Sequence, residues 1–257
     1  MKKHVWLIFA VIVIFSTVFL LFNDKNSYAT GQDAAGEARN KDNRPYESDN
    51  EDYAVVAEKL IDVPAICQYP ELPTGCEATA AAMVLQYYGI NITAEDFAAG
   101  WLVCDAGFYS INGLQYGPDP NEVFAGDPFS EYSYGCYAGP IVSAVNKNSA
   151  QCRAQKITGE SLETLCAEYI DQEKPLLIWA TMNMKQSEQG DTWYLQNGAR
   201  FTWIRGEHCL VLVGYNEDHY FLNDPQSGST AAYEKEIVEV RFKELGSQAV
   251  YISKVNR

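Results

Sequence analysis

Basic residues are scarce in this chain of 257 residues, which has 19 lysines and arginines against 34 aspartates and glutamates. The resulting net charge of −15 argues against nucleic acid and against an anionic membrane surface as partners. Histidine is scarcer still, with three residues, and no Cys-x-x-Cys pair occurs. Both shortages argue against a structural zinc site, and the chemistry predicted below needs no metal or cofactor. We find no internal repeat.

Cysteine, by contrast, is abundant, with seven residues, which is an odd number. If Cys76 stays a free thiol, the other six can form three disulfides in an oxidising compartment. Six reduced cysteines packed in the core are the alternative interpretation. The six are Cys67, Cys104, Cys136, Cys152, Cys166 and Cys209.

The N-terminal part predicts a location outside the cytoplasm. An uncharged run at residues 5–22 follows two lysines and is just long enough to span a bilayer. The lysines favour an N-terminus inside the cell and a C-terminal part outside it. We therefore predict a membrane anchor in residues 1–24, with a signal peptide cleaved near residues 27–29 as the alternative. The protein is then anchored in the membrane or secreted.

Residues 25–52 are rich in acidic residues, asparagine, glycine and lysine, and contain only two aromatic residues, Tyr28 and Tyr46. Such a segment cannot bury enough apolar surface to order itself, so we predict a disordered linker. The folded domain is expected at residues 53–257, which is a usual size for one domain, and we expect a monomer.

Hydrophobic patterns predict helices in the first half of this domain and strands in the second, which indicates an α+β fold with two halves facing each other. Residues 104–137 show no period and are expected to form an irregular functional loop. Residues 234–245 fit a helix or a strand. The helices are predicted at 76–88, 93–102, from Pro140 onward and at 161–172. The strands are predicted at 176–181, 208–215, 219–223 and 249–253, with a hairpin at 193–204 that turns at Asn197–Gly198.

One candidate nucleophile, Cys76, opens an alanine-rich helical run that Gly89 ends. At a helix N-terminus, unpaired N–H groups and the macrodipole favour a thiolate, so we predict a lowered pKa for Cys76. Gln68, eight residues upstream, is placed to offer its amide N–H to an oxyanion beside the sulfur. Glu77 is interpreted as a favourable charge in the first helical turn.

A base for this thiol is expected in the second half of the domain. His208 begins an apolar strand, and a turn near residues 216–217 pairs it with positions 224 to 226 of the next strand. Asp224 is therefore expected beside His208, where its carboxylate accepts a hydrogen bond from the imidazole. His219 is interpreted as a solvent-facing strand residue.

Four segments carry a resemblance to a known family. They read Q-Y-P-E-L-P-T-G-C-E-A-T, G-P-D-P-N-E-V-F-A-G-D-P, E-H-C-L-V-L-V-G-Y and N-D-P-Q-S-G, in this order. The chain resembles papain-like cysteine peptidases related to the bacteriocin-leader-processing family, cysteine peptidase family 39, and most closely their stand-alone cell-surface relatives in Gram-positive bacteria. The match spans residues 61–253. It differs from the bacteriocin processors in Gly75-Cys76-Glu77, where they have Asp-Cys-Gly, and in lacking an attached transporter, so their double-glycine leader substrate does not carry over.

The resemblance implies a papain-like fold, in which the N-terminal helical half carries Cys76 and the C-terminal antiparallel sheet carries His208 and Asp224. It also implies a peptidase that cleaves peptide or protein substrates through a thioacyl-enzyme, with Cys76 as nucleophile, His208 as base, Asp224 as orienting acid and Gln68 as oxyanion donor. A transpeptidase or amidase of the cell envelope is the first alternative. A non-catalytic surface binding module is the second, although the complete set of four residues argues against it.

Overall fold

The computed structural model describes residues 57–255. Within this part of the chain, no helix is long and apolar enough to cross a bilayer. The segments 1–24 and 25–52, for which we predict a membrane anchor or signal peptide and a linker, lie outside the described residues. Both assignments therefore stay predictions.

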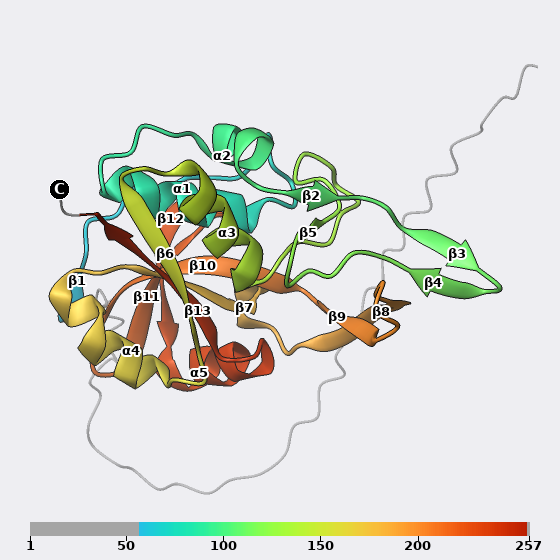
Figure 1. Cartoon of the computed structure of the whole chain (residues 1–257). Helices are drawn as coiled ribbons and strands as arrows, with labels where there is room; N and C mark the ends of the chain where they lie inside the picture. Colours follow the sequence, from blue (N-terminus) through green and yellow to red (C-terminus); the bar gives the residue numbers. More distant parts are fainter. Residues whose placement is uncertain (1–56, 256–257) are drawn as a thin grey trace, which may run out of the picture. The chain divides into compact units, whose positions relative to one another are not determined.

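An antiparallel sheet of seven strands lies at the centre of the described domain (Figure 1). Its strand order is β12-β11-β10-β7-β13-β6, and β1 pairs with the end of β10. Every pairing in this sheet is antiparallel. The strands are β1 (Lys59–Leu60), β6 (Cys152–Thr158), β7 (Leu176–Thr181), β10 (Glu207–Tyr215), β11 (His219–Asp224), β12 (Ser229–Glu234) and β13 (Gln248–Lys254).

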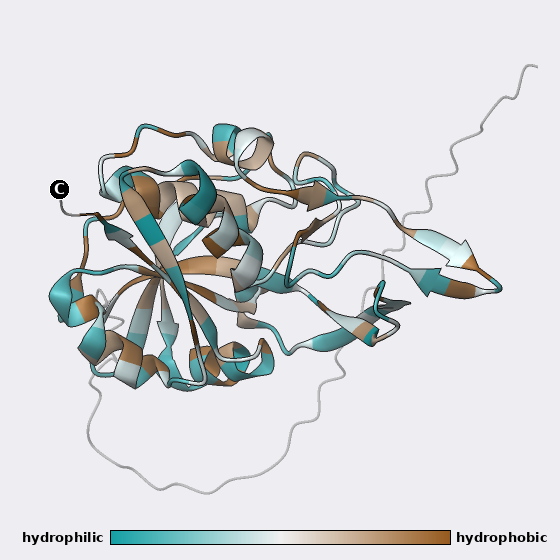
Figure 2. Ribbon diagram, in the orientation of Figure 1, coloured by the Kyte–Doolittle hydropathy of each residue, from teal (hydrophilic) through white to brown (hydrophobic). Residues whose placement is uncertain are grey.

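Helices cover both faces of the sheet, with α1 and α3 on one face and α5 on the other (Figure 1). All six residues of β7 are buried, as expected for a strand covered on both faces. Figure 2 shows hydrophobic residues along most of β10, beside β7. The helices are α1 (Cys76–Tyr87), α2 (Ala94–Gly100), α3 (Ala138–Asn148), α4 (Leu162–Glu168) and α5 (Lys235–Glu244), with 3₁₀ turns at Ile170–Gln172 and Met182–Met184.

Two smaller sheets lie beside the central one. A four-stranded sheet has the order β3-β4-β8-β9, and β2 pairs with β5 in parallel. The β3–β4 hairpin extends beyond the rest of the domain in Figure 1. The bounds are β2 (Cys104–Asp105), β3 (Tyr109–Ile111), β4 (Leu114–Tyr116), β5 (Phe124–Ala125), β8 (Glu188–Tyr194) and β9 (Arg200–Arg205).

The predicted α+β class is confirmed, and local signals located several elements well. Thr93 caps α2 by accepting a hydrogen bond from the backbone N–H of Asp96 at 3.0 Å. The hairpin of β8 and β9 turns at Asn197–Gly198, where Gly198 adopts φ +83°. Residues 235–244, part of the segment left open between helix and strand, form a helix.

Other expectations were wrong. Residues 104–137 contain the four short strands β2 to β5 instead of one irregular loop. Strands β3 and β4 form a local hairpin that turns at Asn112–Gly113, whereas β2 pairs with β5 and β4 with the more distant β8. The single helix expected at 161–172 breaks at Tyr169, whose φ of −123° and ψ of −56° depart from helical values. Strands β6 and β12 were not predicted.

The expectation of three disulfides was also wrong, since all seven cysteines are free. Four of the six non-candidate cysteines are buried, and they lie on separate parts of the core, just before α3 and within β6, α4 and β10. Their thiols therefore act as small apolar side chains, as the alternative interpretation held. The four are Cys136, Cys152, Cys166 and Cys209.

Candidate active site

Cys76 is the first residue of α1, and its side chain is buried with 6% exposure. The helix is buried from this residue to Leu85. The loop before it packs tightly, because a Cβ added to Gly75 would lie 2.8 Å from the Cβ of Leu72. The thiol is thus held at the start of a rigid helix.

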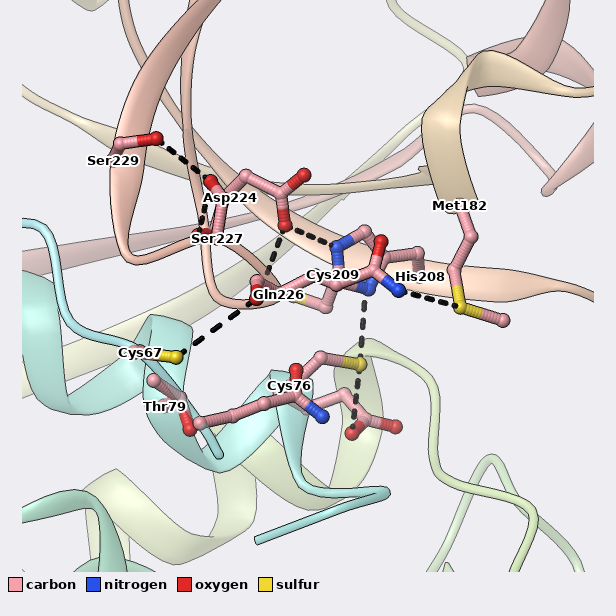
Figure 3. Close-up of polar contacts among 12 residues, drawn as sticks. Cys67, Cys76, Thr79, Met182, His208, Cys209, Asp224, Gln226, Ser227 and Ser229 are labelled. Carbon is pink, nitrogen blue, oxygen red and sulfur yellow. Dashed lines mark hydrogen bonds and ion pairs between the residues drawn. The ribbon is translucent and has the colours of Figure 1, made fainter. Parts of the chain in front are cut away.

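His208 and Asp224 lie side by side at the facing ends of β10 and β11. These strands are antiparallel with Val211 paired to Asn223, so the beginning of β10 meets the end of β11. His208 Nε2 lies 2.7 Å from Asp224 Oδ1, and both side chains are buried (Figure 3). The structure brings this pair together as the turn predicted, while its catalytic role stays a prediction.

The Asp224 carboxylate has further donors around it. Oδ1 also accepts the backbone N–H of Gln226 at 2.7 Å, and Oδ2 accepts the Tyr233 hydroxyl at 3.5 Å. Burial raises the pKa of Asp224, but the hydrogen bond and charge of His208, together with these two donors, outweigh burial and hold it below its usual value. Asp224 is therefore ionised at neutral pH and suited to orient an imidazole.

Cys76 and His208 line the same pocket, which has a volume of about 180 Å³. Because Nε2 of His208 is engaged by Asp224, Nδ1 is the ring nitrogen left for this pocket. A carbonyl bound there would have a thiol and an imidazole beside it, which is the arrangement that nucleophilic acyl transfer requires. The other lining residues are Gln68, Tyr69, Pro73, Thr74, Ser133, Tyr134, Met182, Trp203, Gly206, Glu207 and Gln226.

The sulfur of Cys76 has two hydrogen-bond partners in the described part of the chain, and neither is His208 (Figure 3). The thiol lies 3.3 Å from Glu77 Oε2, and the backbone N–H of Cys209 donates to the sulfur at 3.4 Å. Both groups therefore line the pocket, but no hydrogen bond links the sulfur to the imidazole.

The predicted lowering of the Cys76 pKa was wrong. Burial raises the pKa of this thiol well above its usual value, and the charges of Glu77 and Glu207 raise it further, while only the Cys209 N–H lowers it. The helix N-terminus is thus outweighed by desolvation and two carboxyl groups. Only the folded structure shows that Glu207 lies beside Cys76.

Gln68 lines the pocket, but its amide is turned toward its own loop. Nε2 donates to the carbonyl oxygens of Leu72 and Pro73, each at 3.0 Å, and the buried Oε1 has no partner. Both amide hydrogens are therefore used. The role of oxyanion donor stays a prediction, and it requires Gln68 to release at least one of these carbonyls.

The analysis of the sequence missed a buried pair of carboxyl groups, Glu77 and Glu207. Glu77 lies in the first turn of α1, as predicted, but it is fully buried, and its Oε1 accepts the backbone N–H of Cys136. Glu207 is 7% exposed, and its Oε1 has no partner. A signal was present, since Glu77 lies in an alanine-rich run beside Cys76 and Glu207 directly precedes His208 at the start of an apolar strand.

Burial raises the pKa values of both carboxyl groups, Glu77 and Glu207. Burial raises the pKa of Glu77 to about 7, although hydrogen bonds from Cys136 and Cys76 lower it. Burial and then the charge of Glu77 raise the pKa of Glu207 well above its usual value. Glu77, whose two oxygens both have donors, is therefore the first of the pair to ionise.

Among the described residues, one group brings three possible metal ligands within 4.8 Å of one another, namely Cys76, Glu77 and Glu207. Glu77 already uses both carboxylate oxygens, Oε1 on the N–H of Cys136 and Oε2 on the thiol. Its ligand atoms are engaged by donors of the protein itself, so we do not assign a metal to this cluster.

Gly135 leaves the space in which the two carboxyl groups meet. A Cβ there would lie 2.6 Å from Glu77 Oε1 and 3.2 Å from Glu207 Oε2, and the residue adopts φ +147°. Gly135→Ala is therefore expected to destabilise the protein by about 1–3 kcal/mol, the usual range for overpacking. Urea unfolding measures this change, with Gly100→Ala as control, because nothing lies within 4 Å of a Cβ at Gly100. Equal stability of the two variants would contradict this packing.

A cysteine at a helix N-terminus and a His–Asp pair on adjacent antiparallel strands form the papain-like α+β arrangement, and comparison with known proteins gives the family. Residues 60–250 match the Peptidase_C39-like family, so the chain belongs to it. An uncharacterised protein of Bacillus subtilis, YvpB, is 31% identical over 186 residues, which cover 72% of this chain and 71% of that protein.

Solved structures agree on the fold. A suspected C39-like peptidase from Bacillus anthracis is 32% identical with a TM-score of 0.65, and the match covers 78% of this chain and 98% of that one. The peptidase domain of Streptococcus ComA, a bifunctional ABC transporter of a quorum-sensing pathway, matches at 16% identity and a TM-score of 0.43 over 76% of this chain and 97% of that one. The second similarity is too distant to carry any argument, so the agreement on the fold rests on the Bacillus anthracis structure.

Proposed function

We propose that this protein is an extracytoplasmic cysteine peptidase in which Cys76, His208 and Asp224 form a catalytic triad. The observation that carries the proposal is the shared pocket, in which Cys76 and the free edge of an Asp224-bound imidazole lie together. Membership of the C39-like family supports peptide substrates. The apolar run at residues 5–22 supports the location.

The reaction begins when the Cys76 sulfur gives its proton to Nδ1 of His208 and attacks the peptide carbonyl carbon. The negative charge on the carbonyl oxygen is stabilised by the backbone N–H of Cys76 and, after its amide turns, by Gln68. The carbon–nitrogen bond then breaks, and the imidazolium gives its proton to the leaving amine. A thioester to Cys76 remains.

Water completes the cycle. His208 takes a proton from water, the hydroxide attacks the thioester carbonyl, and the carbon–sulfur bond breaks to release a carboxylic acid. The proton returns to the sulfur. Throughout these steps Asp224 keeps Nε2 protonated and the ring in one orientation.

Product analysis tests this proposal against acyl transfer to an amine. The full-length protein is incubated with a mixture of peptides of defined sequence, with and without a simple amine, and new termini are identified by mass spectrometry. We expect free carboxyl termini in both samples, and none after alkylation with iodoacetamide. Amide products alone would support the transpeptidase alternative, and the absence of any product across a broad peptide set would contradict the proposal.

A further inference from the structure

The proposed reaction requires the Cys76 sulfur to reach His208, yet in the structure the sulfur is bound elsewhere. It accepts the N–H of Cys209 at 3.4 Å and lies 3.3 Å from Glu77 Oε2 (Figure 3). One proton must lie between the sulfur and this carboxylate oxygen. The high pKa of the thiol, raised by burial and the nearby carboxyl groups, places that proton on the sulfur.

The Glu77 carboxylate is held in place by the backbone. Its Oε1 accepts the N–H of Cys136 just before α3, and Gly135 leaves room for it on the other side. The residue is fully buried, so no water competes for Oε2. The fold itself therefore fixes the contact between the Glu77 carboxylate and the sulfur.

We propose that Glu77 is a further catalytic residue, whose carboxylate holds the Cys76 thiol in a resting hydrogen bond away from His208 and so keeps the nucleophile protonated. Acyl transfer then starts when the sulfur leaves Glu77 for the imidazole. Glu77 is a brake on thiolate formation, because its negative charge opposes a second one on the adjacent sulfur. The inference rests on the proposed function only in taking Cys76 as the nucleophile.

The charge that acts most on the sulfur belongs to Glu77, which is in hydrogen-bond contact with it, and the charge of Glu207 has the smaller effect. Glu77 has two protein donors, whereas Oε1 of Glu207 has none, so Glu77 is the first of the pair to ionise. The titratable groups around the Glu77 carboxyl are Cys76 on α1, Cys104 on β2, Cys136 and Tyr137 just before α3, and Glu207 and Cys209 on β10. None of these groups carries a positive charge.

Glu77→Gln tests the brake, because it keeps an acceptor for the Cys136 N–H and removes the charge. Alkylation of Cys76 in the full-length protein by iodoacetamide is followed against pH by peptide mass mapping. At pH 8 we expect the variant to react about 10-fold faster than wild type, since a change of one pKa unit alters the thiolate fraction tenfold. The ratio of rates should approach one at pH 5, where Glu77 with a pKa of about 7 is already neutral.

Glu207→Gln is the matched control. It changes the other carboxyl of the pair, whose charge raises the pKa of Cys76 less than that of Glu77 does, so we expect a clearly smaller acceleration than in Glu77→Gln. The same acceleration in both variants would overturn the assignment to Glu77. Slower alkylation of Glu77→Gln would also overturn it, because Glu77 would then act as a base, and an unchanged profile would leave Glu77 with a purely structural role.

If Glu77→Gln does not fold, infrared spectroscopy of the wild-type protein tests whether the resting Cys76 is a protonated thiol. The difference spectrum between wild type and Cys76→Ala is expected to show an S–H stretching band at pH 7, shifted by a hydrogen-bond acceptor. Absence of this band would mean a resting thiolate and would overturn the proposal.

Neither measurement uses a substrate, so the two proposals fail separately. A Cys76 that alkylates as expected in a protein without peptidase activity would refute the proposed function and leave the brake standing. Peptidase activity together with an alkylation profile that Glu77→Gln leaves unchanged would support the proposed function and refute the brake.

Discussion

Replacement of Cys76 by alanine is expected to reduce peptide hydrolysis by roughly 10⁵- to 10⁶-fold, similar to the loss of a serine-protease nucleophile. No other side chain can form the thioester, since the remaining pocket residues offer no second thiol. The variant should fold, because the deleted thiol is small and its helix is otherwise unchanged. Initial rates at several substrate concentrations, with a thermal melt for each protein, measure the effect.

Cys104→Ser is the matched control for this prediction. Cys104 is also a free cysteine, but it is exposed on β2 and does not line the pocket. Its loss should change the rate less than about twofold, the usual scale for a surface substitution of this kind. Activity that survives in Cys76→Ala and disappears in another cysteine variant would show that the nucleophile has been misassigned.

Replacement of Asp224 by alanine is expected to lower kcat by about 10⁴-fold, with a much smaller change in KM. The imidazole would lose the acceptor at 2.7 Å that fixes its orientation and stabilises its protonated form. Asp224→Asn should lose less, because an amide oxygen can still accept from Nε2 and from the Gln226 N–H. That variant lacks the negative charge and the acceptor that Oδ2 offers to the Tyr233 hydroxyl.

This graded series separates orientation from charge. Asp218→Ala, in the exposed turn between β10 and β11, is the control and should leave kcat unchanged. If Asp224→Ala raised KM and left kcat intact, Asp224 would contribute to substrate binding, and the orienting role would be wrong.

Local signals in the sequence predicted the elements that carry the site. A glycine-bounded alanine run predicted α1, and a short turn between two apolar strands predicted that His208 meets Asp224. Both signals act over a few residues, so no distant contact was needed. Strand β6 gave no comparable signal, because its sequence C-R-A-Q-K-I-T is mostly polar and only Cys152 and Ala154 are buried.

Distant contacts explain what was missed in the site. Glu77 and Glu207 are 130 residues apart in the sequence, and only the packing of α1 against β10 brings them together. Their proximity reverses the expected shift of the Cys76 pKa, because desolvation and like charges exceed the effect of a helix N-terminus. The same dependence on packing applies to Gln68, whose amide is taken up by two carbonyl groups of its own loop.

The central claim, that Cys76 carries the acyl group, is tested most directly by trapping the intermediate. The full-length protein is mixed with a peptide that it cleaves, or with an activated ester of the same acyl group, and quenched in acid before turnover is complete. Intact-mass and peptide analysis should then show one acyl adduct, on Cys76, that is absent in Cys76→Ala and accumulates when water attack is slowed. Cleavage without any adduct, or an adduct on a different residue, would contradict the claim.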